Sequence, residues 1–261
     1  MEGSERVASG SITGGIVGSA LGIISSVAGF LWVLAFTAFN NAYNSAVALQ
    51  FLIFDQAHLT WVMHQSFFMN LHVHGVLDGF IGATLILSIL LAVTIILVGV
   101  GLYGLGKATD METAGTVALV SGVVSGILAP ILLLIGAAAG ENTMTPLSIA
   151  ILRSLLVEPG ILEEAPVGLI VLVGGVPAVN QLALWLGLVV VGLTIILFGV
   201  VFIKLREGLS SPSLSVAIGV LSIIAGIAYM IYVPGSIIGF IMLFIISTLE
   251  IVLFAQSREL T

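Results

Sequence analysis

Long apolar runs separated by short polar connectors dominate this sequence. Six runs are nearly free of charge and long enough for a helix to cross about 30 Å of hydrocarbon, which takes about 18 or more residues. We therefore predict an all-α polytopic membrane protein with six transmembrane helices. The predicted spans cover residues 12–38, 76–105, 114–139, 168–204, 213–233 and 236–256.

The fourth apolar run is too long for one upright helix. It contains Gly174, Gly175 and Pro177, and both residue types disfavour the interior of a helix. We predict that the helix breaks there, and that the part crossing the membrane covers residues 179–204.

Two long connectors, residues 40–75 and 140–167, separate spans of a predicted single membrane domain that covers residues 1–261. Lys and Arg near the ends of spans favour the cytoplasmic side. With six spans, Arg153 alone falls on the side of the long connectors, and the other basic residues fall opposite: Arg6, Lys107, Lys204, Arg206 and Arg258. This asymmetry predicts a protein integral to the cell membrane, with both termini cytoplasmic and both connectors outside.

Parts of the sequence recur at an offset of 100 residues. Thr94-Ile95-Ile96-Leu97 returns as Thr194-Ile195-Ile196-Leu197, and Leu249–Phe254 reads LEIVLF, close to LTIILF at 193–198. Small residues match in the same way: Gly15, Gly22 and Ser25 with Gly115, Gly122 and Ser125, and Gly126 with Gly226. These matches predict three two-helix repeats, over residues 1–110, 111–210 and 211–261, the last without a long outer connector. Matches among Leu, Ile, Val and Gly also arise by chance in apolar chains, so the alternative of no repeat stays open.

Composition agrees with lipid as the solvent. Hydrophobic residues make up 59% of the 261 and charged residues 7%, against about 25% charged in soluble domains. Six Lys and Arg in all offer no phosphate-binding surface, so nucleic acid is excluded as a partner. The absence of cysteine excludes disulfides, iron–sulfur ligation and thiolate zinc sites. No nucleophile–base pair or paired-carboxylate site stands out, so we do not expect the chain to be catalytic on its own.

All four histidines lie in one stretch, Asp55–Phe80, which reads DQAHLTWVMHQSFFMNLHVHGVLDGF. On a continuous helix, at about 100° per residue, His72 and His74 are about 200° apart. The four imidazoles therefore cannot converge from one straight helix. A bend near Asn70 or Gly75, or a partner chain, would be required.

Three interpretations of this stretch stay open. It could be an interfacial or re-entrant helix whose histidines face headgroups and water. Its histidines could also titrate near neutral pH and serve a proton or substrate pathway, with Asp55 one turn before His58 and placed to orient it. Or the imidazoles could bind haem b or copper, with a methionine as a soft ligand. The candidate ligands are then His58, His64, His72, His74, Met63 and Met69.

Within this stretch, residues 70–80 read NLHVHGVLDGF. This segment resembles the start of the His-bearing helix in heme-copper oxidase-type membrane proteins, where a His-x-His or His-Gly element opens a long apolar helix and one imidazole holds a haem. The resemblance implies that His72 or His74 would be an axial ligand. No other span contains a histidine, so the second axial ligand and a copper-ligand set are missing. The chain would then be a relative or a partner subunit, not a complete oxidase core.

Two acidic residues fall within the predicted spans. Glu250 is well inside the sixth span, where a carboxylate costs several kcal/mol unless it is protonated or paired. We expect either a neutral carboxyl bonded to Ser or Thr of a neighbouring helix, or a proton or cation site. Asp78, at the mouth of the second span, is a second candidate ion site, although the helix dipole favours it simply as a helix-start residue.

Taken together, these features favour an integral membrane subunit of a larger respiratory or electron-transfer complex, with a histidine cluster on the outer side that holds haem or copper. Its partners would be the bilayer and other membrane subunits, or further copies of itself. A transporter or channel for a small solute, ion or proton is the first alternative. A purely structural scaffold is the second.

The cofactor hypothesis has a direct spectroscopic test. If an imidazole holds haem, purified protein shows a Soret band that disappears when His58, His72 and His74 are all replaced by Ala. If copper is bound, elemental analysis finds it in the parent protein and not in that variant. Purified protein with neither a Soret band nor copper removes the redox hypothesis.

Overall fold

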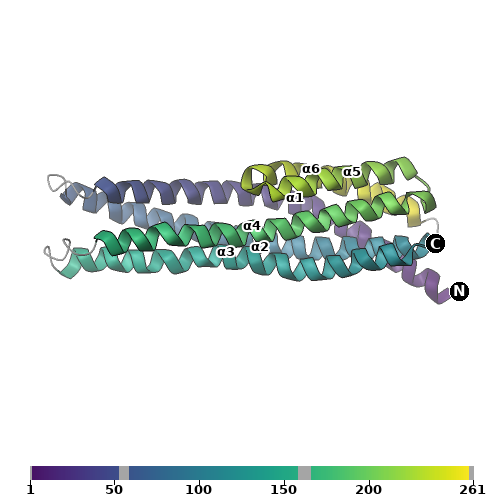
Figure 1. The fold of residues 1–261 in the computed structure, drawn as a ribbon, viewed down its shortest axis with the longest axis horizontal. Coiled ribbons are helices and arrows are strands. Elements are labelled where there is room, and N and C mark those ends of the chain that lie inside the picture. Colours follow the sequence, from purple (N-terminus) through teal and green to yellow (C-terminus); the bar gives the residue numbers. More distant parts are fainter. Residues whose placement is uncertain (1, 53–58, 158–165, 259–261) are drawn as a thin grey trace. The chain divides into compact units, whose positions relative to one another are not determined.

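The structure is a computed structural model. It describes the backbone of residues 2–52, 59–157 and 166–258, and the side chains of residues 8–42, 75–138, 181–231 and 235–258. All regular structure in this part of the chain is helical (Figure 1). The elements are α1 (Glu2–Leu52), α2 (Leu59–Ala108), α3 (Glu112–Val157), α4 (Pro166–Leu205), the 3-10 turn η3 (Arg206–Gly208), α5 (Pro212–Met230) and α6 (Tyr232–Ser257).

Each of the six α-helices contains a segment long and apolar enough to cross a membrane. These segments are Ala8–Ala42, Gly75–Ala108, Glu112–Ala138, Gln181–Gly208, Pro212–Met230 and Gly235–Ser257. The prediction of an all-α membrane protein with six transmembrane helices is confirmed, and the bilayer is the environment of this chain.

The first four helices are much longer than a membrane crossing needs. α1 has 51 residues, which corresponds to about 75 Å at about 1.5 Å per residue, whereas the hydrocarbon core measures about 30 Å. Helix therefore extends into both predicted connectors, over residues 40–52, 59–75, 140–157 and 166–167. By contrast α5 and α6, with 19 and 26 residues, match one crossing.

The predicted break in the fourth run is wrong. α4 is helical from Pro166 to Leu205 and passes through Gly174, Gly175 and Pro177 without interruption. Pro177 removes one N–H donor, and the helix continues through it because the neighbouring backbone groups keep their bonds along α4.

The chain divides into two compact units. Unit 1 comprises Met1–Val33, Leu85–Leu133 and Trp185–Thr261, and unit 2 comprises Leu34–Thr84 and Leu134–Leu184. Each of α1 to α4 contributes one segment to each unit. The prediction of a single membrane domain over residues 1–261 stays a prediction.

Unit 2 contains an aromatic cluster among its described side chains. The ring of Phe80 on α2 lies 5.6 Å from that of Phe36 and is stacked on that of Phe39 at 5.5 Å, both on α1. Gly136 of α3 lies against Leu184 of α4. These contacts hold α1 to α2, and α3 to α4, within this unit.

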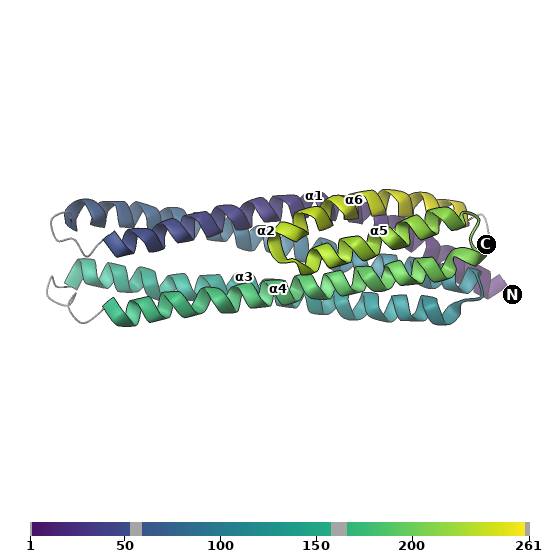
Figure 2. The same ribbon diagram turned by 45° about the horizontal axis from the view of Figure 1, so that its top comes forward.

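In unit 1 each helix contacts the next one along the chain, and α6 lies beside α1 (Figure 2). Phe254 of α6 also contacts Gly101 of α2 and Phe202 of α4. Glycine makes most of these contacts close. A Cβ atom built on Gly99 of α2 would lie 2.9 Å from the carbonyl oxygen of Ala118 on α3. One built on Gly199 of α4 would lie 2.6 Å from that of Gly219 on α5. Such close approach is how helices associate in lipid, where no hydrophobic effect drives them together.

The outward surface of unit 1 carries many large aliphatic side chains. Ile24 on α1 is 54% exposed, Ile127 on α3 is 57% exposed and Ile224 on α5 is 47% exposed. Small and hydroxyl-bearing residues face inward instead, among them Ser25, which is fully buried. A surface this apolar would make a soluble protein aggregate, but it is what a lipid-facing surface requires.

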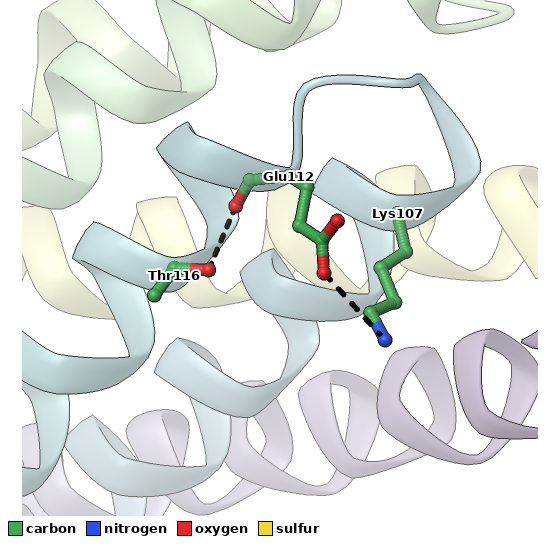
Figure 3. A network of polar contacts seen from close by, with 3 residues as sticks. All are labelled: Lys107, Glu112 and Thr116. Atoms are coloured by element: carbon green, nitrogen blue, oxygen red, sulfur yellow. Dashed lines mark hydrogen bonds and ion pairs between the residues drawn. The ribbon is translucent and has the colours of Figure 1, made fainter.

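A short turn connects α2 to α3 within unit 1, and three polar side chains lie beside it (Figure 3). Asp110 adopts a positive φ of 57° there, a conformation that Asp tolerates better than most residues. Lys107 Nζ lies 3.8 Å from Glu112 Oε1, and Thr116 donates a hydrogen bond of 2.9 Å to the carbonyl oxygen of Glu112. Since Glu112 is exposed and Lys107 only partly buried, the pair adds little to stability.

Helix contact through glycine predicts a stability difference between two Gly→Ala variants. At Gly122 a new Cβ would lie 2.9 Å from the backbone oxygen of Ile95, which cannot rotate away, whereas at Gly10 nothing lies within 4 Å. We expect Gly122→Ala to lower Tm in detergent by about 2–10 °C, the equivalent of about 1–3 kcal/mol of overpacking. Gly10→Ala should leave Tm unchanged or slightly raised. Equal Tm values for the two variants would contradict the packing described.

Candidate functional site: a buried carboxyl among inter-helix hydroxyl bonds

In the described part of unit 1, three buried hydrogen bonds between side chains join one helix to another. Ser25 of α1 bonds Thr94 of α2 at 2.9 Å, and Thr194 of α4 donates to Ser125 of α3. The third is a bond of 2.8 Å from the hydroxyl of Ser19 on α1 to the carboxyl of Glu250 on α6. All six side chains are buried. We call this set the polar belt: Ser19, Ser25, Thr94, Ser125, Thr194 and Glu250.

Two bonds of the polar belt occupy equivalent places in the proposed repeat. Ser25 and Thr94 each lie 100 residues before Ser125 and Thr194, and both pairs are bonded. The α2–α3 and α4–α5 contacts correspond in the same way. Gly126 lies against Ile96, and Gly226 against Ile196. These paired contacts support the predicted repeat, which stays a prediction.

Glu250 departs from this pattern. In the alignment of LTIILF with LEIVLF it stands where Thr194 stands in the second repeat. Its bond does not join the two helices of one repeat but runs from α6 to α1. Glu250 is 4% exposed and Ser19 is fully buried. The bond to a hydroxyl on a neighbouring helix, expected from the sequence, is therefore present.

Glycines at seven-residue spacing shape the α1–α6 seam around this bond. Gly15 lies against Phe254, Gly22 against Ser247, and Gly29 against Phe240. We call these contacts, with the Ser19–Glu250 bond, the α1–α6 seam. A seven-residue period keeps one stripe of α1 facing one stripe of α6 over several turns. Glu250 lies between Ser247 and Phe254 on that stripe, about two helical turns before Ser257.

The chemistry available here is that of one carboxyl group in an apolar setting. A carboxyl can take up and release a proton, and a buried one is costly as an isolated anion. Among the described side chains, no group of three or more His, Asp or Glu is placed to hold a metal ion. Proton uptake and release is therefore the reaction these residues could support.

Most of the other predicted site residues lie outside the described side chains. His58 and Asp55 lie outside the described residues altogether, and for the rest the backbone alone is described, as part of α2: Met63, His64, Met69, His72 and His74. The backbone does bear on one expectation. α2 is helical without a break from Leu59 to Ala108, so Asn70 and Gly75 both lie inside one helix. Convergence of the imidazoles, through a bend of this helix or through a partner chain, stays a prediction.

Asp78 is not a helix-start residue. It is exposed and lies well inside α2, which begins at Leu59, because helix continues into the segment predicted as a connector. The dipole explanation for Asp78 is therefore wrong. A role as an ion site stays a prediction.

Sequence reasoning did not single out Ser19, Ser25, Thr94, Ser125 or Thr194 as site residues. A signal existed for four of them, because the 100-residue offset matched Ser25 with Ser125 and Thr94 with Thr194. Nothing of the kind marks Ser19, since Leu119 and Gly219 stand at the same offsets.

The two Ser–Thr bonds predict measurable coupling energies. In a double-mutant cycle on unfolding free energy, Ser125→Ala and Thr194→Val should couple by about 0.6 kcal/mol, the average for hydrogen bonds between membrane helices. The Ser25→Ala and Thr94→Val cycle should give a similar value. The crossed pair, Ser25→Ala with Thr194→Val, should be additive. Coupling in the crossed cycle as large as in the bonded ones would contradict the assignment.

Any functional reading of the polar belt rests on the geometry of this chain. The belt joins five of the six helices of unit 1 and contains one ionisable group. Comparison with protein-family models, with curated proteins and with solved structures finds no match to this chain.

Proposed function

We propose that this protein moves a small ion across the membrane, with Glu250 as the group that binds and releases it. The observation that carries the proposal is the burial of this one carboxyl inside a six-helix unit whose outer surface is aliphatic. Ionisable residues in such surroundings are expensive to keep and mark ion pathways and proton relays in membrane proteins.

The alternative of a purely structural role explains Glu250 less well. Elsewhere in the polar belt, Ser and Thr join helices without an ionisable group. A Gln at position 250 has the same length and could bond Ser19 without the cost of a carboxyl in hydrocarbon. Ion transport explains why a carboxyl is present at this position, whereas a helix-joining role does not.

Orientation and assembly belong to the same proposal. We place both termini on the cytoplasmic side of the cell membrane. Lys107, Lys204 and Arg206 lie at span ends on the same side as the termini, and basic residues at span ends favour the cytoplasmic side. Association with other membrane subunits or with further copies is compatible with ion transport. The redox-subunit hypothesis remains separate, because it depends on histidines whose side chains are not described.

Proteoliposome flux tests the proposed function. We expect purified protein to dissipate an imposed gradient of protons or of another small cation, and Glu250→Gln to reduce that flux at least about tenfold, because Gln keeps the size and hydrogen-bonding ability of Glu but cannot exchange a proton or bear charge. Glu112→Gln, at the exposed turn between α2 and α3, is the matched control and should retain full flux.

Two results would overturn the proposal. One is the absence of flux of any small ion through folded wild-type protein. The other is full flux through Glu250→Gln, since that would show transport independent of the carboxyl. Circular dichroism and Tm establish that each variant is folded before its flux is compared.

A further inference from the structure

We infer that the ion is a proton, and that Glu250 exchanges it with water when the α1–α6 seam opens. This inference rests on the proposed function and deepens it, because it names both the transported species and the moving contact. It uses the geometry around Glu250 and the contacts between α1 and α6.

The ligands around Glu250 suit a proton better than a metal ion. Ser19 supplies the one hydrogen bond that the carboxyl receives in the described part of the chain. A hard cation such as Mg²⁺ or Ca²⁺ takes about six to eight oxygen ligands, far more than a carboxyl and one hydroxyl offer. A proton needs a single carboxyl oxygen.

Proton exchange at this carboxyl balances without a co-reactant other than water. The carboxylic acid transfers its proton to a water molecule in the opened seam, which becomes hydronium, and the remaining carboxylate accepts the Ser19 hydroxyl bond. A proton taken from hydronium on the other side of the membrane restores the acid. Ser19 thus positions the carboxyl in both protonation states.

No other charge shares the immediate surroundings of Glu250. Over the described side chains, α1 has none in residues 8–42 and α5 has none, whereas α6 has Glu250 alone before Arg258. The charges on the helices around it lie at or near span ends: Asp78 and Lys107 on α2, Glu112 on α3, and Lys204 at the end of α4. The state of Glu250 therefore depends chiefly on access to water.

The α1–α6 seam is the contact in unit 1 best built to open. Short connectors tie α2 to α3 and α4 to α5, and the hydroxyl of Ser215 on α5 further bonds the carbonyl oxygen of Phe202 on α4. No short connector joins α6 to α1. Across this seam, in the described part of the chain, Ser19 bonds Glu250, and a change of protonation alters that bond.

A disulfide across the seam tests the inference, and a chain without cysteine suits the purpose. A Cβ built on Gly22 would lie 3.1 Å from the Cβ of Ser247, so Gly22→Cys with Ser247→Cys needs a shift of only a few tenths of an ångström to reach disulfide geometry. We expect oxidation to reduce proton flux at least about tenfold, and reduction to restore it, because a covalent link forbids the two helices to separate.

The α4–α5 contact provides a matched control. A Cβ built on Gly199 would lie 3.0 Å from the Cβ of Ser222, so Gly199→Cys with Ser222→Cys places the same residue types in the same geometry at a different helix pair. Oxidation of this variant should leave proton flux unchanged. Loss of flux in both variants, or in neither, would overturn the assignment of the seam.

Single cysteines keep the inference testable if a double variant does not fold. Ser247 and Ser222 are equally buried, at 1% exposure. We expect a water-soluble maleimide to label Ser247→Cys under an imposed pH gradient and to leave Ser222→Cys unlabelled. Equal labelling of the two, or no labelling of Ser247→Cys, contradicts an opening seam.

The outcomes separate this inference from the proposed function. Flux of Na⁺ or K⁺ that depends on Glu250, without proton flux, overturns the choice of the proton but leaves ion transport intact. Proton flux that depends on Glu250 and survives the Gly22–Ser247 disulfide overturns the seam alone. Wild-type protein without any flux overturns the proposed function itself.

Discussion

A backbone or side-chain polar group inside hydrocarbon must find its partner within the protein, because no water is there to bond it. This constraint explains why each of the six membrane-crossing segments is a helix. It also explains the inter-helix bonds of the polar belt, where Ser25 meets Thr94 and Ser125 meets Thr194. With hydroxyls so paired, close glycine contacts supply the remaining attraction between helices.

The spans could be predicted from the sequence because hydropathy measures transfer into lipid directly. The true ends of the helices could not, since hydropathy does not tell a helix that crosses the membrane from one that continues beyond it. Residues 40–52 and 59–75 were therefore assigned to a connector, although they are helical. The prediction that Asp78 begins a helix was wrong for the same reason, because α2 begins at Leu59 and not near the predicted start of the span.

The candidate site could be predicted in part. Glu250 was recognisable because a carboxyl inside a span is exceptional, and a hydroxyl partner was expected on energetic grounds. The identity of that partner, Ser19, could not be predicted, because it depends on which helices are in contact in the folded protein and on the register between them. Sequence periodicity places residues on a face of one helix but does not say which helix lies opposite.

The three predicted repeats and the position of Glu250 bear on each other. Three equivalent repeats would carry the same Ser–Thr bond three times, but position 225 is Ala and position 250 is Glu. The third repeat thus lacks the internal bond of the other two, and its carboxyl bonds Ser19 of the first repeat instead. In the first two repeats, neutral hydroxyl pairs hold the helices together. The ionisable group lies where the third repeat differs, at the contact between α6 and α1, and a change in its protonation acts on that contact directly.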